Sequence, residues 1–244
     1  MNVQIVEIMG RSTQGITRPF KCRGDDGHIY FVKGRGAGRR SQICEWIAGQ
    51  LALRLGLPIA PFEVVDVPEE LIRLDFSDEL QDLGVGLAFG SRKLSVVELS
   101  LSHLEHVPQD VQRDVLAFDW WVKNADRTLS ELGGNPNLFW DIGTQELVVI
   151  DHNQAFDRNF SPSAFVDLHA FCTEWPALAG DWDRQQKLAA RFEAAMADWT
   201  AICNTVPPEW WFLDSEQTVR TDFDLDVTYQ LLMEFQTPTF WRLT

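Results

Sequence analysis

The sequence predicts an α+β protein with two lobes, a small strand-rich N-terminal lobe and a larger, mainly helical C-terminal lobe. Short runs rich in β-branched and aromatic residues dominate the first third of the chain, whereas apolar residues at helical spacing dominate the second half. The chain has 244 residues, 45% of them hydrophobic, so it can bury a sizeable core without cross-links. We expect lobes over residues 1–88 and 89–244, with a hinge within 84–95.

The N-terminal lobe is expected to begin with strands. Residues 3–9 alternate between apolar and polar, and residues 18–23 and 28–33 are strand candidates on either side of the turn-forming sequence 24–27. A Gly- and Arg-rich segment over 34–40 follows. The pattern predicts a hairpin that leads into a loop.

A helix is predicted over residues 42–55. Its apolar residues recur every four positions, Ser41 is a favourable N-cap, and Gly56 is placed to end the helix. A further strand is expected over 58–67, because this run is rich in Val and Phe. Residues 84–90 are rich in glycine, which predicts a flexible or strand-edge connection.

The C-terminal lobe is predicted to be mostly helical around one hairpin. The expected elements are a helix over 108–124, strands over 137–140 and 146–150 joined by a turn at 141–144, a helix over 181–204 and a last helix over 217–236. A Pro- and Trp-containing break over 207–211 separates the last two helices, because proline cannot continue a helix. The sequence contains no internal repeat and no long linker.

The charge of the chain disfavours several classes of ligand. Its 36 acidic and 21 basic residues give a formal net charge of −15 at pH 7, which repels nucleic-acid phosphates and anionic membranes. A small anion held in a locally basic pocket is compatible with this charge. The four cysteines are scattered, and we find neither a secretory signal nor a membrane-spanning apolar run. We therefore expect a cytoplasmic protein with reduced cysteines that binds neither nucleic acid nor membranes.

The densest group of polar residues lies within 124–157. Two antiparallel strands joined by a tight turn bring their outer ends together, so Asn137 should lie near Asp151. Their oxygens suit Mg²⁺, which takes its remaining ligands from water and phosphate. Asp126, just upstream, is then a candidate acceptor for a hydroxyl proton. The alternative is that these residues only form turns and caps, as Asn and Asp commonly do.

A set of short motifs occurs in a characteristic order along the chain. They are Thr17-Arg18-Pro19, Asp25-Asp26-Gly27, Tyr30-Phe31-Val32-Lys33, Glu45-Trp46-Ile47-Ala48-Gly49, Leu55-Gly56-Leu57-Pro58, Ala88-Phe89-Gly90-Ser91-Arg92, Asn124-Ala125-Asp126-Arg127-Thr128, Asn135-Pro136-Asn137-Leu138 and Ile150-Asp151-His152. This order resembles that of the HipA-like kinases, in particular their short single-domain branch. That family is related to the phosphatidylinositol 3- and 4-kinases and, more distantly, to protein kinases. The resemblance covers roughly residues 10–215.

The resemblance implies a two-lobed, protein-kinase-like fold that holds ATP and Mg²⁺ between its lobes. Lys33 would pair with the α- and β-phosphates, and Glu45 would hold Lys33 in place. Asp126 would be the catalytic aspartate, whereas Asn137 and Asp151 would bind the metal. Without the resemblance, Lys33 and Glu45 are ordinary solvated residues at a strand end and on a helix.

The resemblance also implies a phosphate-covering loop over 11–17. Gly15, Ile16 and Thr17 would bind the nucleotide there, with Gly15 allowing close approach of the backbone. Phe89 would also contact the nucleotide. The loop has one glycine, so it is not a Gly-x-Gly-x-x-Gly loop.

One spacing departs from that of protein kinases. Asn137 lies eleven residues after Asp126, whereas in protein kinases the corresponding asparagine lies five residues after the aspartate. Asn135 and Glu131 are therefore alternative metal ligands. We favour Asn137, because Pro136 and the strand that follows fix its direction.

The resemblance implies a function as well as a fold. Members of the family are serine/threonine kinases that can act as toxins in toxin–antitoxin pairs, which implies a protein substrate and an antitoxin partner. One alternative is a catalytically inactive kinase fold that acts as a binding or scaffolding module, as the stretched spacing suggests. Another is an acidic decoy for DNA-binding proteins, suggested only by the net charge.

Overall fold

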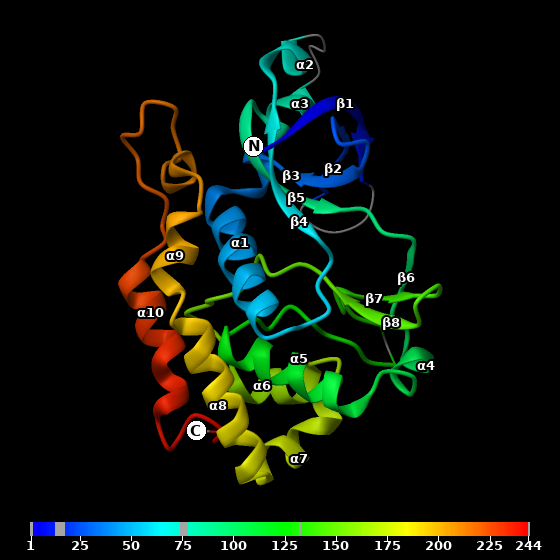
Figure 1. Cartoon of the computed structure of the whole chain (residues 1–244), viewed down its shortest axis with the longest axis vertical. Helices are drawn as coiled ribbons and strands as arrows, with labels where there is room; N and C mark the ends of the chain where they lie inside the picture. The colour runs from blue at the N-terminus through cyan, green and yellow to red at the C-terminus, as the bar shows by residue number, and fades with distance from the viewer. Residues whose placement is uncertain (1, 13–17, 74–77, 132, 244) are drawn as a thin grey trace. The chain divides into compact units, whose positions relative to one another are not determined.

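The computed structural model describes residues 2–12, 18–73, 78–131 and 133–243 (Figure 1). The chain divides into two compact units, each made of separated segments. The first unit comprises Met1–Trp46, Ala60–Ser95 and Val206–Phe223, and the second comprises Ile47–Ile59, Val96–Thr205 and Asp224–Thr244. The lobes expected over residues 1–88 and 89–244 stay a prediction, and each compact unit combines three segments that are separated in the sequence.

A closed β-barrel forms the centre of the first unit (Figure 1). Its strands are β1 (Val3–Arg11), β2 (Phe20–Gly24), β3 (Ile29–Lys33), β5 (Gly86–Arg92) and β4 (Phe62–Val67), in this order around the barrel. All neighbouring pairs are antiparallel except β1 and β4, whose parallel pairing closes the barrel. The predicted mixture of strands and helices is confirmed, but the closure into a barrel was not foreseen.

The barrel interior is filled by apolar side chains from every second position of its strands. Cys22, Tyr30, Val32 and Val65 are among its most buried members, each at most 2% exposed. This alternation is what places one face of each strand inside a barrel. Burial also raises the pKa of the Cys22 thiol to about 12, so this cysteine behaves as a small hydrophobic residue.

Strand β5 corrects the prediction of a flexible or strand-edge connection over 84–90. It pairs with β3 on one side and β4 on the other, so it is an inner strand. Glycine is required at position 90 by packing, because a Cβ there would lie 2.7 Å from Val65 Cγ1. The glycines that suggested flexibility therefore permit close contact between strands.

Helix α1 (Arg39–Arg54) starts earlier than predicted. Ser41 lies inside the helix and is not its N-cap, since the helix follows Gly38, whose φ of +85° interrupts the preceding 3₁₀ turn Arg35–Ala37. Residues 39–46 of α1 belong to the first unit, which also contains the short helices α2 (Glu69–Arg73) and α3 (Asp78–Leu83).

The second unit combines a small sheet with most of the helices (Figure 1). Its strands β6 (Val96–Glu98), β7 (Leu138–Asp141) and β8 (Glu146–Val149) form an antiparallel sheet in that order. The predicted hairpin is thereby confirmed. The helices are α4 (Leu101–Leu104), α5 (Gln109–Trp121), α6 (Pro162–Leu168), α7 (Trp175–Gly180), α8 (Trp182–Met196), α9 (Trp199–Asn204) and α10 (Leu225–Met233).

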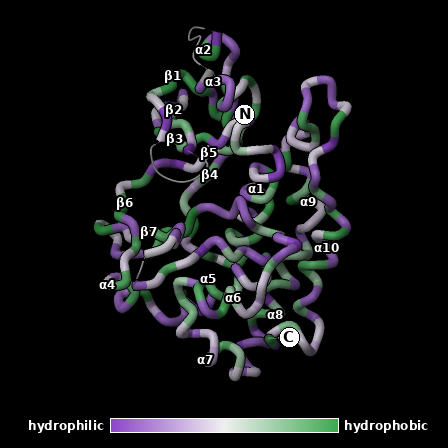
Figure 2. Tube along the Cα trace, turned by 180° about the vertical axis from the view of Figure 1, so that it is seen from behind, coloured by the Kyte–Doolittle hydropathy of each residue, from purple (hydrophilic) through white to green (hydrophobic). Residues whose placement is uncertain are grey.

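Two predicted helices differ from those observed. The predicted helix over 181–204 is divided into α8 and α9, and the last helix, α10, starts eight residues after the predicted start at residue 217. Local caps set these starts, because Asp181 accepts a hydrogen bond from the Arg184 backbone N–H and Asp224 accepts from two backbone N–H groups. Hydrophobic and hydrophilic residues alternate along the helices, as expected where only one face is buried (Figure 2).

Aromatic side chains from α5 form the core of the second unit. The Trp121 ring stacks on Phe192 at a centroid distance of 4.2 Å, and its indole N–H donates to the Leu232 carbonyl at 2.7 Å. The Trp120 indole N–H donates to the Phe240 carbonyl at 2.9 Å. Burying both rings with their polar atoms bonded fixes α5 and the loop that follows it.

Within the described ranges, no helix is long and apolar enough to cross a membrane.

Candidate active site

The predicted pair of Lys33 and Glu45 forms within the first unit. Lys33 ends β3, Glu45 lies on α1, and the Lys33 ammonium donates to the Glu45 carboxylate. Their side chains are only 9% and 2% exposed. Burial of this kind contradicts the solvated alternative for both residues, because a buried charge requires a partner.

Neighbouring groups hold the two elements that carry this pair. The Gln42 side chain, on α1, donates to the Lys33 carbonyl at 2.6 Å, and the Arg39 guanidinium donates to the Gln42 side-chain oxygen at 2.9 Å. Phe89 lies opposite Lys33 in the β3–β5 ladder, and its buried ring stacks on Phe62 at 5.5 Å. Nucleotide contact by Phe89 stays a prediction. Gly15, Ile16 and Thr17 lie outside the described residues.

The three predicted acidic and amide residues come together within the second unit. Asn137 donates from its side chain to the Asp126 backbone carbonyl at 2.9 Å and to the Asp126 carboxylate at 3.3 Å. The hairpin joins the ends of its strands as expected, since the Ile150 N–H donates to the Asn137 carbonyl at 3.1 Å. Asp151 follows directly and lies close enough to Asp126 for its charge to act on that carboxyl group.

The backbone at both candidate metal ligands is unusual. Asn137 and Asp151 have φ values of +50° and +58°, in the left-handed region. Asn and Asp reach this region more readily than other non-glycine residues, yet it is uncommon even for them. Such conformations persist where the surrounding structure fixes them, which is frequent at functional sites.

The environment of Asp126 makes it a better proton acceptor than an ordinary aspartate. Partial burial raises the pKa of its carboxyl group, and the nearby Asp151 charge raises this pKa further. Hydrogen bonds from Asn135 and Asn137 and the charge of Arg127 act in the opposite direction without cancelling the rise. Asp126 is therefore partly desolvated and still accepts hydrogen bonds that orient it.

Arg127 is a residue whose importance sequence reasoning missed. Its fully buried guanidinium donates to three backbone carbonyls, those of Pro136 (3.3 Å), Asn137 (2.9 Å) and Ile150 (3.1 Å). These carbonyls flank Asn137 and Asp151 in the sequence. Arg127 follows Asp126 directly and bonds to the backbone at or next to Asn137 and Asp151. It thus holds the backbone of all three candidate residues in place.

A buried carboxylate neutralises Arg127. The carboxylate of Asp119, on α5, accepts hydrogen bonds from Arg127 Nε at 2.6 Å and from the Asn124 side chain at 2.9 Å. It also lies 3.0 Å from His169 Nε2. Although burial acts in the opposite direction, these partners hold the pKa of Asp119 well below its usual range. Burial lowers the pKa of His169, so this imidazole is neutral at physiological pH. A charged residue within the apolar run Phe118-Asp119-Trp120 was the sequence signal for this network.

The donor atoms of Asn137 and Asp151 fit a hard cation. Both offer oxygen, and the Asn137 amide nitrogen faces Asp126, which leaves its amide oxygen for another partner. In the part of the chain that is described, no cluster of three or more His, Cys, Asp or Glu side chains could hold a metal. A two-residue oxygen site suits Mg²⁺, which keeps several waters and phosphate oxygens as ligands. Of the alternatives, Asn135 donates to Asp126 at 3.2 Å, and Glu131 is exposed.

Comparison with known proteins identifies one matching family. The sequence model described as HipA-like kinase matches residues 5–244. No curated protein matches the chain. Among solved structures, the Helicobacter pylori proinflammatory kinase CtkA is similar, with a TM-score of 0.53 at 10% sequence identity, over 92% of this chain and 89% of that one. That score at that identity indicates a shared fold.

A second solved structure is similar only in part. The complete CtTel1 dimer with C2 symmetry has a TM-score of 0.30 and 13% identity, over 96% of this chain and 12% of that one. This score is too low to indicate a common fold.

Proposed function

The chain belongs to the HipA-like kinase family, and on this premise we propose that it is an ATP- and Mg²⁺-dependent kinase that phosphorylates a serine or threonine of a protein. The observation that carries this proposal is the grouping of Asp126, Asn137 and Asp151 around one buried arginine. Proton acceptor and metal ligands are the groups that phosphoryl transfer requires, because it depends mainly on positioning and charge neutralisation.

Asp126 has the properties required of the proton acceptor. The hydroxyl oxygen of the protein substrate forms a bond to the γ-phosphorus of ATP, while the bond from this phosphorus to the β–γ bridging oxygen breaks and ADP leaves. The hydroxyl proton passes to the Asp126 carboxylate. A raised pKa favours this transfer, since it brings the basicity of the carboxylate closer to neutral pH.

Lys33 and Glu45 are proposed to act on the nucleotide phosphates. The Lys33 ammonium would bind the α- and β-phosphates, with Glu45 holding it in place. Asn137 and Asp151 would hold Mg²⁺, which when bound neutralises charge on the phosphate oxygens. Gly15, Ile16 and Thr17 would cover the phosphates, as the resemblance to the family implies.

The finer biological role is proposed from the family alone. Members of this family can act as toxins, so we propose a toxin that pairs with an antitoxin and acts in the cytoplasm. The competing proposal is a catalytically inactive scaffold, which the eleven-residue interval between Asp126 and Asn137 favours. The hydrogen bonds from Asn137 to Asp126 weaken that alternative, because the longer loop still returns Asn137 to the aspartate.

A thermal melt with millimolar Mg-ATP tests the nucleotide site without knowledge of the substrate. At a ligand concentration of 100 times Kd, binding stabilises a protein by about 2.7 kcal/mol. Because a chain of this size gains roughly 2–4 °C per kcal/mol, we expect a shift of several degrees that requires magnesium. Asp151→Ala should lose the shift, whereas Asp167→Ala, which removes an exposed carboxylate of α6, should keep it.

The outcomes separate the two proposals. The absence of a shift in the wild type would contradict the nucleotide site. A magnesium-dependent shift without any turnover of ATP, in the presence or absence of candidate substrates, would favour the inactive scaffold.

A further inference from the structure

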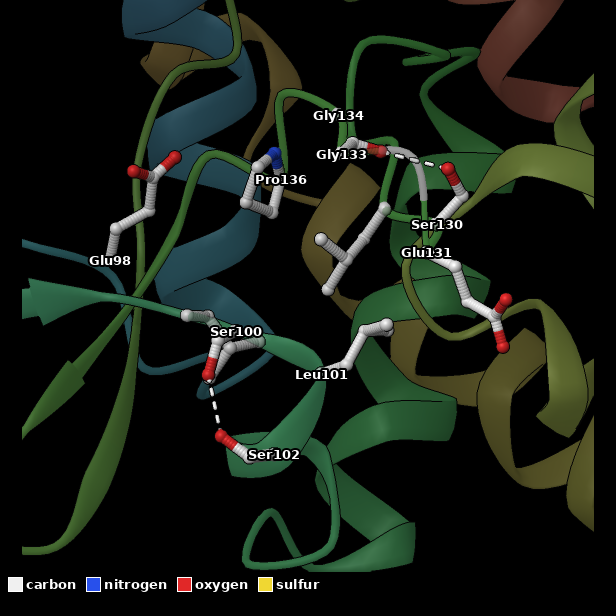
Figure 3. A pocket seen from close by; sticks show the side chains of 11 residues that line it. Glu98, Ser100, Leu101, Ser102, Ser130, Glu131, Gly133, Gly134 and Pro136 are labelled. Carbon is white, nitrogen blue, oxygen red and sulfur yellow. Dashed lines mark hydrogen bonds between the residues drawn. The ribbon is translucent and has the colours of Figure 1, made fainter.

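A pocket in the second unit lies beside the candidate catalytic group (Figure 3). Its volume is about 530 Å³, within the usual range for ligand pockets. One wall is the segment 98–102, where β6 leads into α4, and the other is formed by the loop that joins Asp126 to Asn137. Of the residues described as lining it, Glu131 was an alternative metal ligand to the favoured Asn137, and the proposed phosphoryl transfer uses none of them.

The loop wall is internally bonded and attached to Asp126. The Thr128 N–H donates to the Asn135 carbonyl at 3.1 Å, and Ser130 and Gly133 exchange two backbone hydrogen bonds of 3.0 Å. The Asn135 side chain then donates to the Asp126 carboxylate at 3.2 Å. The described residues of this loop therefore form a hydrogen-bonded wall, one hydrogen bond away from the candidate catalytic aspartate.

The opposite wall is fixed as well. The Leu99 N–H donates to the Leu138 carbonyl at 2.9 Å, which attaches the segment to β7. The Ser100 hydroxyl caps α4 and lies 2.8 Å from the Ser102 hydroxyl and 3.1 Å from His103 Nδ1. A pocket between two hydrogen-bonded walls is present before any ligand binds, which lowers the entropic cost of binding.

The lining has the chemistry to hold a basic side chain. Leu101, Leu129 and Pro136 supply apolar surface, and the exposed carboxylates Glu98 and Glu131 lie on opposite sides of the pocket (Figure 3). The residues described as lining it include no Lys, Arg or His. Arginine and lysine place their methylene groups along apolar surface and their charge against carboxylates. The net charge of −15 adds long-range attraction for such a partner.

We propose that this pocket binds a basic segment of the protein substrate, in which Arg or Lys flanks the serine or threonine that is phosphorylated. The proposal rests on the proposed kinase function and adds the class of substrate. The position of the pocket beside Asp126 suits the binding of such a segment. Residues that flank the serine or threonine hydroxyl must lie close to Asp126, which receives the proton of that hydroxyl.

Peptide binding tests the proposal by fluorescence anisotropy, without requiring turnover. The probes are a short labelled peptide with a central serine and two flanking arginines, and two matched peptides in which glutamine or glutamate replaces both arginines. The test variant is Glu98→Gln/Glu131→Gln. The control variant is Glu146→Gln/Glu193→Gln, which removes the same net charge from two other exposed positions of the second unit.

We expect the wild type to prefer the arginine peptide, and the test variant to bind it about tenfold more weakly, because two ion pairs are lost. The control variant should bind about as tightly as the wild type. Equal weakening in both variants would overturn the proposal, since it would show general attraction by net charge. Equal binding of all three peptides to the wild type would overturn it as well.

A separate measurement distinguishes failure of the proposal from failure of the kinase function. The test variant should keep the Mg-ATP-dependent thermal shift of the wild type, because the proposed metal ligands are Asn137 and Asp151, with Asn137 favoured over Glu131. A wild type that selects the arginine peptide but shows no shift with Mg-ATP would overturn the kinase function alone. A normal shift without peptide selectivity would overturn only the substrate proposal.

Discussion

At the scale of single residues, the candidate site depends on how buried polar groups are paired. Burial and the charge of Asp151 raise the pKa of Asp126, while hydrogen bonds from Asn135 and Asn137 orient its carboxylate. Arg127 is in turn neutralised by Asp119. Each of these residues supplies a hydrogen bond or an opposite charge to another. Substitutions at different positions of this network should therefore produce different defects.

Asp126→Asn should greatly slow phosphoryl transfer without unfolding the protein. We expect a loss of about 10²–10⁴-fold in rate, because the amide cannot accept the hydroxyl proton. The Mg-ATP thermal shift should persist, since Asp126 is not a proposed metal ligand. Retention of transfer at the wild-type rate would contradict the role of this residue.

The same variant should change the pH dependence of stability. The pKa of Asp126 is higher in the folded chain than in the unfolded chain, so its contribution to stability is complete below the unfolded pKa and is lost as pH rises through the folded pKa. Ionised Asp126 thus destabilises the wild type at neutral pH. Asp126→Asn should unfold at a higher temperature than the wild type at pH 7, and the difference should disappear towards pH 4. Melts across this range measure it.

Arg127→Lys should weaken both stability and transfer. Lysine keeps the charge but has three donors on one atom, so it cannot reach Asp119 and the three carbonyls together. We expect a loss of about 2 kcal/mol in the free energy of unfolding, measured by denaturant titration. The turnover number should fall more than the apparent affinity for ATP, because Asp126, Asn137 and Asp151 would be displaced from one another.

Arg113→Lys is the matched control for this prediction. Arg113 lies on α5 and pairs with the carboxylate of Glu174 at 2.6 Å, but this pair retains access to solvent. Its replacement should cost less than about 1 kcal/mol. Equal losses in the two variants would argue against a special role for Arg127.

At the scale of elements, the loop between Asp126 and Asn137 decides whether the site can form. Eleven positions separate the two residues, yet the loop folds back through the pairing of Ser130 with Gly133 and returns Asn137 to Asp126. Close packing within the loop requires glycine at position 134, where a Cβ would lie 2.3 Å from the Thr128 carbonyl oxygen.

Gly134→Ala should therefore displace the loop. Because the clash is with backbone, we expect a loss of about 1–3 kcal/mol in the free energy of unfolding and a lower turnover number. Gly180→Ala is the control, since a Cβ at that end of α7 meets no atom within 4 Å and should change stability by less than about 0.5 kcal/mol. Thermal melts and ATP turnover of both variants test this. An unchanged Gly134→Ala protein would contradict the described packing.

At the scale of the whole molecule, charge acts on stability as well as on binding. A net charge of −15 produces repulsion among carboxylates that is distributed over the chain. Local ion pairs such as Arg23–Glu7 oppose it, but exposed pairs contribute little each.

Added salt should consequently stabilise the protein. Raising the ionic strength from 0.01 to 0.15 M shortens the Debye length from about 30 to about 8 Å, which screens long-range repulsion more than contact pairs. We expect the melting temperature to rise over this range with NaCl and equally with KCl. A fall would show that attractive pairs dominate, and a difference between the salts would indicate specific ion binding.

The sequence by itself determined the local features of this protein. The alternation of apolar residues and the turn at 141–144 were sufficient to predict a hairpin that brings its outer ends together. In the structure the Ile150 N–H, directly before Asp151, donates to the Asn137 carbonyl. The ordered motifs further indicated the family and the pairing of Lys33 with Glu45. Periodicity, turns and short motifs carry this information because they involve residues close together in the chain.

Only the tertiary structure decided how distant segments combine. The parallel pairing of β1 with β4 closes the barrel, and β5 becomes an inner strand only because it lies between β3 and β4. The burial of Arg127 likewise depends on Asp119 and on carbonyls up to 23 residues away. A sequence pattern shows which face of an element is apolar, whereas the choice of partner for that face depends on the packing of the complete chain.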